Sequence, residues 1–367
     1  MKYYLVAGEA SGDLHGANLM KALKTEDQNA NFRYFGGDKM QAQGGKLVKH
    51  YREMAFMGFT EVILNLRIVF KNLKACKQDI LTYQPDALIL IDFPGFNLKI
   101  AEFAKQQGIK VCFYISPKVW AWNQKRVLKI KKVVDQLFCI LPFEVDFYKQ
   151  WGMEVNYVGN PLLDEIANFS PDLAFRKNQN LSNQKIIALL PGSRKQEIER
   201  LLPDMLSITA SFPNYQFVVA AAPTFTSDYY QQFIGDKNVK LVFSQTYNLL
   251  YHAEAALVAS GTATLETALF KVPQVVLYRG GAISVGIARL VIKIRFISLV
   301  NLIMDRKVVT ELIQNDCTTE KITTELGSIL TGEEREVMLN DYEKLAKRMG
   351  TAGASERTAK LIFDFLR

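Results

Sequence analysis

The chain has 367 residues, of which 49% are hydrophobic and 22% are charged. This balance is typical of a folded protein and excludes a disordered one, and the length favours two domains over one. The net charge of +8 favours anionic partners such as phosphorylated substrates, nucleic acid or an acidic membrane surface.

The cysteines and histidines indicate which disulfide and metal sites to expect. The four cysteines are widely separated and form no C-x-x-C pair, which indicates reduced, buried thiols. With three histidines, a metal centre built from histidine is not expected. The first residues turn acidic at Glu9, too early for a signal peptide, so the chain is expected to stay inside the cell.

The first half alternates strands with helices. Continuous apolar, β-rich runs predict parallel strands at residues 3–7, 32–35, 87–91, 110–115, 137–141 and 155–158. The first strand runs into a glycine turn at residues 8–13 and then a helix. Its glycines lack the dinucleotide spacing, and Ser11 and Asp13 are residue types that could cap that helix.

The strand at 87–91 ends in Asp92. Residues just beyond the carboxyl ends of parallel strands line the ligand crevice, so Asp92 is predicted to be a carboxylate in a cleft, with Asn97 a candidate cap of the next helix. Beyond residue 115, Trp120, Trp122 and several cations form an aromatic, basic lip that could bind nucleic acid. That interpretation ranks lower because no nucleic-acid module accompanies it.

Residues 54–77 combine large apolar side chains with cations. On a helix these apolar residues are too widely spread for one face to bury them all. The surplus could insert into a membrane interface while Arg67, Lys71 and Lys74 meet anionic lipid; a buried core helix is the alternative. A second apolar and basic stretch, residues 282–300, carries three cations, which disfavours a spanning helix.

The second half restarts the pattern after a polar segment at 169–184. Strands are predicted at 185–190, 216–221, 239–243, 255–258 and 274–278. The first of them turns at Pro191 and Gly192 into a helix, where Arg194 could neutralise a diphosphate; a plain surface arginine is the alternative.

The strand at 255–258 leads through Ser260, Gly261 and Thr262 into a helix. The first turn of a helix binds anions through its N–H groups without a metal. Glu266 lies on the same face one turn deeper, where it could accept hydrogen bonds from sugar hydroxyls. This pattern predicts a nucleotide site, and an ordinary capped helix is the alternative.

Two Rossmann-like halves with a nucleotide loop in the second resemble the GT-B glycosyltransferases. Six ordered motifs resemble the lipid-A-disaccharide synthase family over nearly the whole chain, at residues 6–13, 91–97, 119–122, 141–144, 190–194 and 259–266. Two departures stand out. Where the family has I-D-x-P-D-F-N, this chain has Gly95 in place of the second Asp. Where the family has S-L-P-N-L, this chain has Val300 in place of the proline.

The resemblance implies an α/β fold of two Rossmann-like domains facing across a cleft. Residues 1–165 would hold the acceptor and dock on the membrane, and 166–345 would bind the UDP-sugar. The helix in 346–367 would return to the first domain or pack on a second subunit, giving a homodimer. The implied reaction joins UDP-2,3-diacylglucosamine to the 6-hydroxyl of 2,3-diacylglucosamine 1-phosphate, forming a β-1,6 disaccharide and UDP.

The resemblance also assigns roles to residues. Asp92 is the candidate base. The UDP-binding set is Ser193, Arg194, Ser260, Gly261, Thr262, Glu266 and Asn301. The acceptor-side set is Gly8, Glu9, Ser11, Asp13 and Asn97. The membrane and acyl-chain set is Met57, Phe59, Ile63, Leu66, Arg67, Phe70 and Lys71.

No Asp-x-Asp occurs in the sequence, so neither a metal nor another cofactor is expected, and helix N-termini and arginine would take the cation's role. The implied location is cytoplasmic, peripheral on the inner face of the inner membrane, with no nucleic-acid partner. Two alternatives stay open: another UDP-sugar enzyme on the same fold, such as an epimerase or a different lipid-linked sugar transferase, and a non-enzymatic membrane-surface binding protein.

Overall fold

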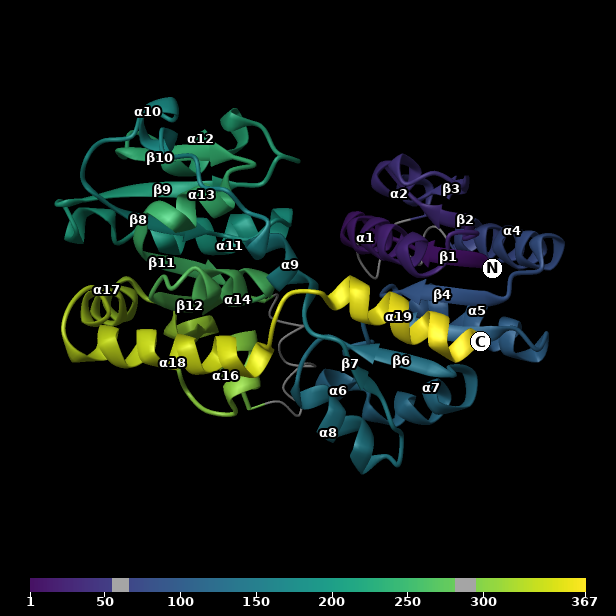
Figure 1. The fold of residues 1–367 in the computed structure, drawn as a ribbon. Coiled ribbons are helices and arrows are strands. Elements are labelled where there is room, and N and C mark those ends of the chain that lie inside the picture. The colour runs from purple at the N-terminus through teal and green to yellow at the C-terminus, as the bar shows by residue number, and fades with distance from the viewer. Residues whose placement is uncertain (55–65, 281–294) are drawn as a thin grey trace. The chain divides into compact units, whose positions relative to one another are not determined.

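The computed structural model describes residues 1–54, 66–280 and 295–367 and divides the chain into two compact units (Figure 1). The amino-terminal unit comprises Met1–Ala167 and Thr351–Arg367, and the carboxy-terminal unit comprises Asn168–Gly350. Each unit is built on a parallel sheet with helices on its faces, which confirms the predicted fold class.

The sheet of the amino-terminal unit has the strand order β3-β2-β1-β4-β5-β6-β7, and all its pairings are parallel. Its strands are β1 (Lys2–Ala7), β2 (Asn31–Gly36), β3 (Lys46–His50), β4 (Ala87–Ile91), β5 (Lys110–Tyr114), β6 (Gln136–Cys139) and β7 (Asn156–Tyr157). The register pairs Ala7 with Ile91 and Ile91 with Tyr114, so β1, β4 and β5 end level with one another.

Helices cover both faces of this sheet. They are α1 (Ala10–Glu26), α2 (Asp38–Ala42), α4 (Leu66–Tyr83), α5 (Pro94–Gln106), α6 (Val119–Trp122), α7 (Val127–Val133), α8 (Phe143–Gln150), α9 (Pro161–Ala167) and α19 (Ala354–Leu366), with short turns η1 (Tyr51–Glu53) and η2 (Gln124–Arg126). Because alternate strand residues point to opposite faces, Tyr4 and Val6 join one core with α4, α5 and α7, while Tyr3 and Leu5 join the other with α1 and α19.

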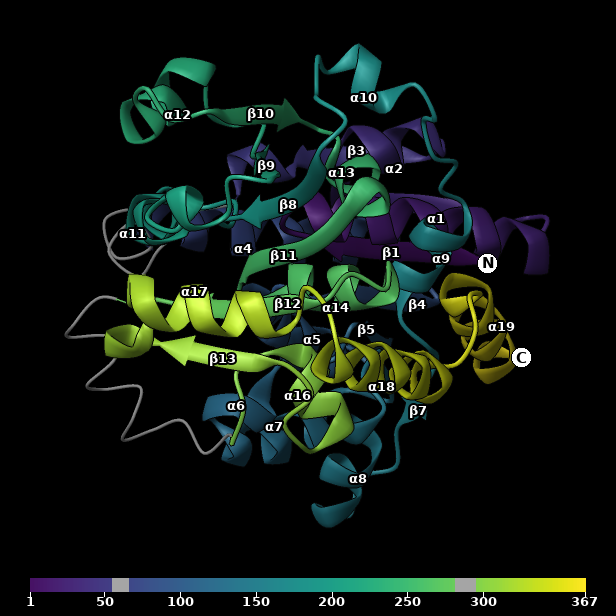
Figure 2. The same ribbon diagram turned by 90° about the vertical axis from the view of Figure 1, so that its left-hand side faces the viewer.

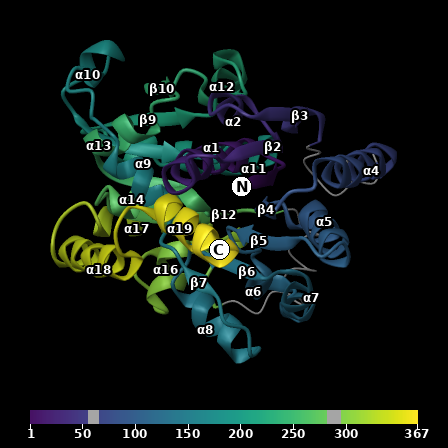
Figure 3. The same ribbon diagram turned by 45° about the vertical axis from the view of Figure 1, so that its right-hand side comes forward.

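The last helix of the chain belongs to this first unit. Helix α19 packs along α1, and Ala359 and Ile362 are fully buried in the shared core (Figure 3). The carboxy-terminal helix was predicted to pack either on the first domain or on a second subunit. The structure confirms the first of these alternatives.

The carboxy-terminal unit has a second parallel sheet with the order β10-β9-β8-β11-β12-β13 (Figure 2). Its strands are β8 (Lys185–Leu190), β9 (Tyr215–Ala221), β10 (Val239–Phe243), β11 (Ala253–Ala259), β12 (Gln274–Tyr278) and β13 (Thr310–Ile313). Its helices are α10 (Phe175–Asn178), α11 (Lys195–Leu206), α12 (Ser227–Ile234), α13 (Thr246–His252), α14 (Thr262–Leu269), α16 (Leu299–Met304), α17 (Thr319–Ser328) and α18 (Glu333–Met349), with η3 (Thr209–Ser211) and η4 (Gln314–Asp316).

Some predicted boundaries were wrong. Helix α1 begins at Ala10, so Ser11 and Asp13 lie inside it and do not cap it. Helix α5 begins at Pro94 after Phe93, because proline suits the first helical position, and Asn97 is therefore not its cap. The edge strands β3 and β13 were missed.

Candidate active site

Two turns of the carboxy-terminal unit lie at the same edge of its sheet. Strands β8 and β11 are neighbours, with Leu190 paired to Val258, so the turns that follow them emerge side by side. The first turn carries Ser193 and Arg194 into α11, and the second carries Ser260 and Gly261 into α14. The structure thus brings these predicted diphosphate-binding residues together.

The turn before α14 is open. Gly261 is the N-cap of the helix with φ of 157°, and among the described residues, its chain neighbours and the helix's own backbone aside, no atom lies within 4 Å of where a Cβ would stand. Gly261 and Thr262 are exposed. The Ser260 hydroxyl instead donates to the carbonyl of Ile297 at 2.9 Å, so it ties the turn to the segment before α16.

Arg194 is held by a neighbouring carboxylate. Its guanidinium donates to Glu197 at 3.0 Å, and Glu197 also accepts from the backbone N–H groups of Ser193 and Arg194 at 3.1 and 3.2 Å. Gly192 permits this contact: its φ is 99°, and an added Cβ would lie 2.4 Å from the Glu197 carboxylate. The Glu197 carboxylate thus already occupies the N-terminus of α11, and the Arg194 side chain is exposed to solvent.

Glu266 is half-buried on α14, and its carboxylate accepts a hydrogen bond from Tyr247 Oη at 3.4 Å. The ring of Tyr247 packs against those of Phe169 and Phe270, which also contact each other. The aromatic packing therefore fixes the orientation of a carboxylate one turn behind the open helix start.

Asn301 is buried in the body of the unit. Its Nδ2 donates to the Val309 carbonyl and to Glu311, and its Oδ1 accepts from the N–H groups of Val308 and Val309. Glu311 also accepts from both the backbone and the hydroxyl of Ser298. Asn301 and Glu311 together hold the segment whose carbonyl at residue 297 anchors Ser260.

In the amino-terminal unit, Asp92 follows the carboxyl end of β4 in a bent turn. Asp92 and Phe93 both have left-handed backbone conformations, with φ of 46° and 48°. Such geometry costs energy and persists where its surroundings enforce it. The buried Asn97 does so here, since its Nδ2 donates to the Asp92 carbonyl at 2.7 Å.

The half-buried Asp92 carboxyl has an altered proton affinity. Burial raises its pKa, while the Lys118 cation and a hydrogen bond from the Phe93 backbone lower it in opposition. A carboxylate that holds a proton more tightly than usual is a better general base than an exposed one.

The predicted acceptor-side residues separate in the structure. Gly8 approaches the Asp92 turn, because a Cβ on Gly8 would lie 2.3 Å from the Phe93 ring. Glu9 and Ser11 are exposed at the start of α1. Asp13 is buried, and its carboxylate accepts from the backbone N–H groups of Gly37, Lys39 and Met40, so it caps α2.

Sequence reasoning did not single out Glu144, a buried residue that follows β6 in the amino-terminal unit. Glu144 is 1% exposed, and burial raises its pKa from 4.5 to about 7. It lies in the motif at 141–144, at the mouth of the preceding strand, and no role was predicted for it. A glutamate three residues after a predicted apolar strand was the local signal.

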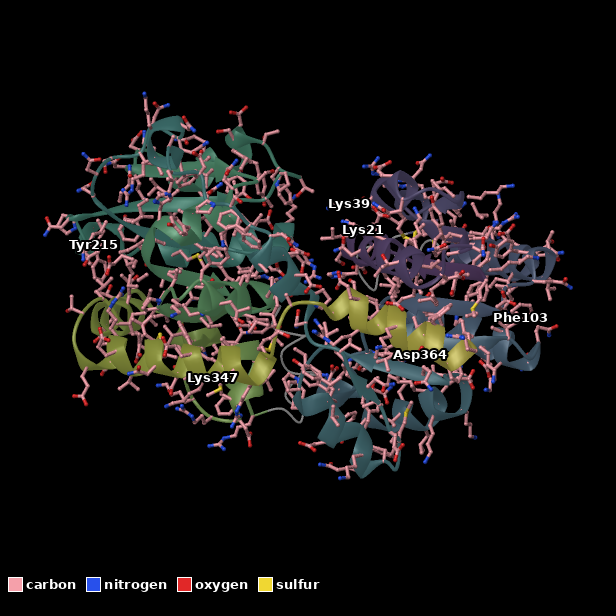
Figure 4. The ribbon with its side chains drawn as sticks, in the orientation of Figure 1. Lys21, Lys39, Phe103, Tyr215, Lys347 and Asp364 are labelled. Carbon is pink, nitrogen blue, oxygen red and sulfur yellow. The ribbon has the colours of Figure 1, made fainter. Side chains whose placement is uncertain are left out.

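The structure describes only part of the predicted membrane and acyl-chain set. Met57, Phe59 and Ile63 lie outside the described residues. On α4, Arg67, Ile68 and Phe70 are exposed, and α4 forms with α5 a groove of about 700 Å³ that includes Phe103 (labelled in Figure 4). The other lining residues are Phe70, Leu73, Lys74, Lys77, Gln78, Leu81, Lys99, Glu102 and Gln106. Within the described ranges, no helix combines the length and the apolar character needed to cross a bilayer.

Comparison with known proteins decides the family. The sequence model of the lipid-A-disaccharide synthetase family matches residues 3–363. This chain belongs to that family. A lipid-A-disaccharide synthase of Myxococcus xanthus (strain DK1622) is 40% identical over 99% of this chain and 97% of its own length, and one of Syntrophus aciditrophicus (strain SB) is 39% identical over the same shares.

Membership of the lipid-A-disaccharide synthetase family confirms the activity and enzyme class predicted from the six motifs: the protein is a glycosyltransferase of lipid A biosynthesis. Solved structures support the fold. The glycosyltransferase of kitacinnamycin matches with a TM-score of 0.70 at 11% identity, covering 100% of this chain and 99% of its own. A UDP-GlcNAc 2-epimerase from Neisseria meningitidis matches with 0.66 at 14% identity over the same shares.

Proposed function

We propose that the protein transfers 2,3-diacylglucosamine from UDP to the 6-hydroxyl of 2,3-diacylglucosamine 1-phosphate, with Asp92 as general base. The new bond is a β-1,6 glycosidic bond, and UDP leaves. The observation that carries the role of Asp92 is its place at the carboxyl end of β4, half-buried, with its pKa raised by burial and its backbone held by Asn97.

In this mechanism, the Asp92 carboxylate accepts the proton of the acceptor's 6-hydroxyl as its oxygen attacks the anomeric carbon of the donor. Attack from the face opposite UDP inverts an α-linked donor to a β-linked product. The bond to the UDP oxygen breaks as the new bond forms, so negative charge builds on the diphosphate and requires stabilisation there.

The diphosphate is stabilised by the carboxy-terminal unit. The open first turn of α14 supplies N–H groups at Gly261 and Thr262 and the positive end of the helix dipole. Arg194 and Ser193 approach from the neighbouring turn, and Arg194 exchanges Glu197 for the diphosphate. Glu266 accepts hydrogen bonds from the ribose. Asn301 serves indirectly, since with Glu311 it holds the segment that anchors Ser260.

Both substrates carry acyl chains, so the enzyme works at the cytoplasmic face of the inner membrane. The exposed apolar and basic side chains of α4 suit that role, because Phe70 can enter the interface while Arg67 and Lys71 meet lipid phosphates. Gly8, Glu9 and Ser11 face the acceptor, and Asp13 shapes the neighbouring turn by capping α2. A homodimer remains part of the proposal.

One assay separates this function from its alternatives. The purified protein is incubated with UDP-2,3-diacylglucosamine and the monosaccharide phosphate in a chelator, and UDP and disaccharide are measured. We expect the two products in equal amounts. Conversion of the donor to a sugar isomer without the acceptor would support an epimerase. Binding to vesicles without turnover or UDP affinity would support a surface-binding protein.

A further inference from the structure

The buried Glu144 organises a polar cluster in the amino-terminal unit. Its carboxylate accepts hydrogen bonds from Ser116 Oγ at 2.9 Å, from Trp120 Nε1 at 3.2 Å, and from the backbone N–H groups of Ile140 and Leu141 at 3.2 and 3.0 Å. Ser116 and Trp120 come from the segment after β5, whereas the other groups belong to the segment after β6. The carboxylate therefore fastens two loops at the same edge of the sheet.

A buried carboxylate in this position lowers the free energy gained on folding. Burying one requires compensation, and within the described residues the hydrogen-bond partners of the Glu144 carboxylate are neutral donors. A well-packed apolar side chain would fill the space at lower cost. What the carboxylate adds is directional: it fixes Ser116 and Trp120, and between them stands Lys118, whose side chain is exposed.

Lys118 lies on the segment that follows the strand next to that of the proposed base. Strands β4 and β5 are paired neighbours, and the Asp92 N–H donates to the Tyr114 carbonyl at 3.1 Å, so the segments that follow both strands start side by side. The ammonium of Lys118 is close enough to stabilise the charged form of Asp92. An exposed cation on one of these neighbouring segments thus acts electrostatically on the carboxylate proposed as the base on the other.

We propose that Lys118 binds the phosphate of the acceptor while Asp92 takes the proton of its 6-hydroxyl, and that Glu144 is a positioning residue for Lys118. This rests on the proposed function. In a pyranose, C1 and C5 both neighbour the ring oxygen, so the phosphate on C1 and the hydroxymethyl group on C5 lie at the same edge of the ring, on opposite faces in the α anomer. A base and a cation close together can meet both groups.

The test of Lys118 compares two acceptors that differ only in the phosphate, 2,3-diacylglucosamine 1-phosphate and 2,3-diacylglucosamine. For Lys118→Ala we expect KM for the phosphorylated acceptor to rise by about 10- to 100-fold, the range of a charge-assisted hydrogen bond, with kcat little changed. Lys125→Ala, an exposed lysine seven positions further on, is the matched control and should leave KM unchanged.

Binding of both acceptors is also measured by calorimetry, so the test does not depend on turnover. We expect the wild type to prefer the phosphorylated acceptor and Lys118→Ala to lose that preference. Equal losses with both acceptors, or a preference that survives the substitution, would overturn the proposal. Failure of the proposed function has a different signature, namely no disaccharide from the wild type with either acceptor.

The test of Glu144 is a double-mutant cycle. If Glu144 acts through Lys118, Glu144→Gln raises KM for the phosphorylated acceptor and adds little in the Lys118→Ala background. Ser116→Ala, which removes one of the hydrogen bonds to Glu144 together with the contact of Ser116 to Tyr148 Oη, is a milder second variant, and circular dichroism verifies that each variant folds. Equal effects on both acceptors, or additive effects in the cycle, would leave Glu144 a purely structural residue.

Discussion

The guanidinium of Arg194 donates to the carboxylate of Glu197 at 3.0 Å, across the first turn of α11. If Arg194 gives up this partner to hold the diphosphate, Arg194→Ala should weaken UDP binding by roughly tenfold or more. Titration calorimetry with UDP measures this. Lys195→Ala is the matched control, since it removes a neighbouring exposed cation. Equal weakening in both variants would reduce Arg194 to a general surface charge.

Asp92→Asn should lower kcat by about 100-fold or more, the usual contribution of a general base, with UDP binding unchanged. A base must be deprotonated to act, and burial raises the pKa of Asp92. The acid limb of the pH profile of kcat/KM should therefore lie above the ordinary aspartate value of about 3.9, with activity lost as pH falls through it. An acid limb near or below that value, or near-normal turnover in the variant, would remove Asp92 from this role.

The sequence patterns predicted the strands of both sheets and the positions where those strands end, because both depend on local composition. Continuous apolar runs located β4 and β11, and the residue after each run proved to lie at the carboxyl edge of its sheet. Edge strands β3 and β13 are less apolar, with one buried residue between them, Leu312, so they gave no such run.

The side-chain partners were less accessible, because they depend on segments far apart in the sequence. Asn97 reaches back to the strand ends at Val6 and Ile91, and Asp13 caps a helix that starts twenty-five residues later at Asp38. Neither partner follows from spacing on one helix. For the same reason Glu144 and Glu311 were not singled out, although each collects several buried hydrogen bonds.

Glu144 should also make stability depend on pH. Its pKa is raised from 4.5 to about 7 in the folded state, so between these values the folded protein binds more protons than the unfolded chain. Unfolding free energy should therefore fall as pH rises through this window, by at most roughly 3 kcal/mol from this group. Chemical denaturation of the wild type and Glu144→Gln at several pH values checks it. Identical slopes for the two proteins would contradict the assignment.

Glu266→Ala should weaken UDP by about tenfold, the cost of losing a charge-assisted hydrogen bond to the ribose. The measurement is titration with UDP, with inorganic diphosphate as a second ligand that should be unaffected. Glu343→Ala, an exposed glutamate on α18, is the control for the loss of one negative charge. Unchanged UDP affinity in Glu266→Ala would contradict the ribose assignment.

Replacing Phe59, Ile63 and Leu66 with Ser should reduce association with anionic vesicles, and Phe70→Ser should do so on its own. Phe70 is 60% exposed on α4, beside the lysines of the groove. Vesicle flotation measures association. The control is Leu173→Ser, because Leu173 is 80% exposed on the other unit. Undiminished association in correctly folded variants would contradict a membrane role for these side chains.

The first unit is assembled from two separate stretches of chain. Asp164 accepts hydrogen bonds from the N–H groups of Gly353 and Ala354, and Arg357 donates to the carbonyls of Val158, Thr351 and Ala352. A gene fragment ending at residue 167 would therefore encode a protein with the α1 face uncovered. A recombinant acceptor domain for crystallography needs the final helix grafted on through a short artificial linker.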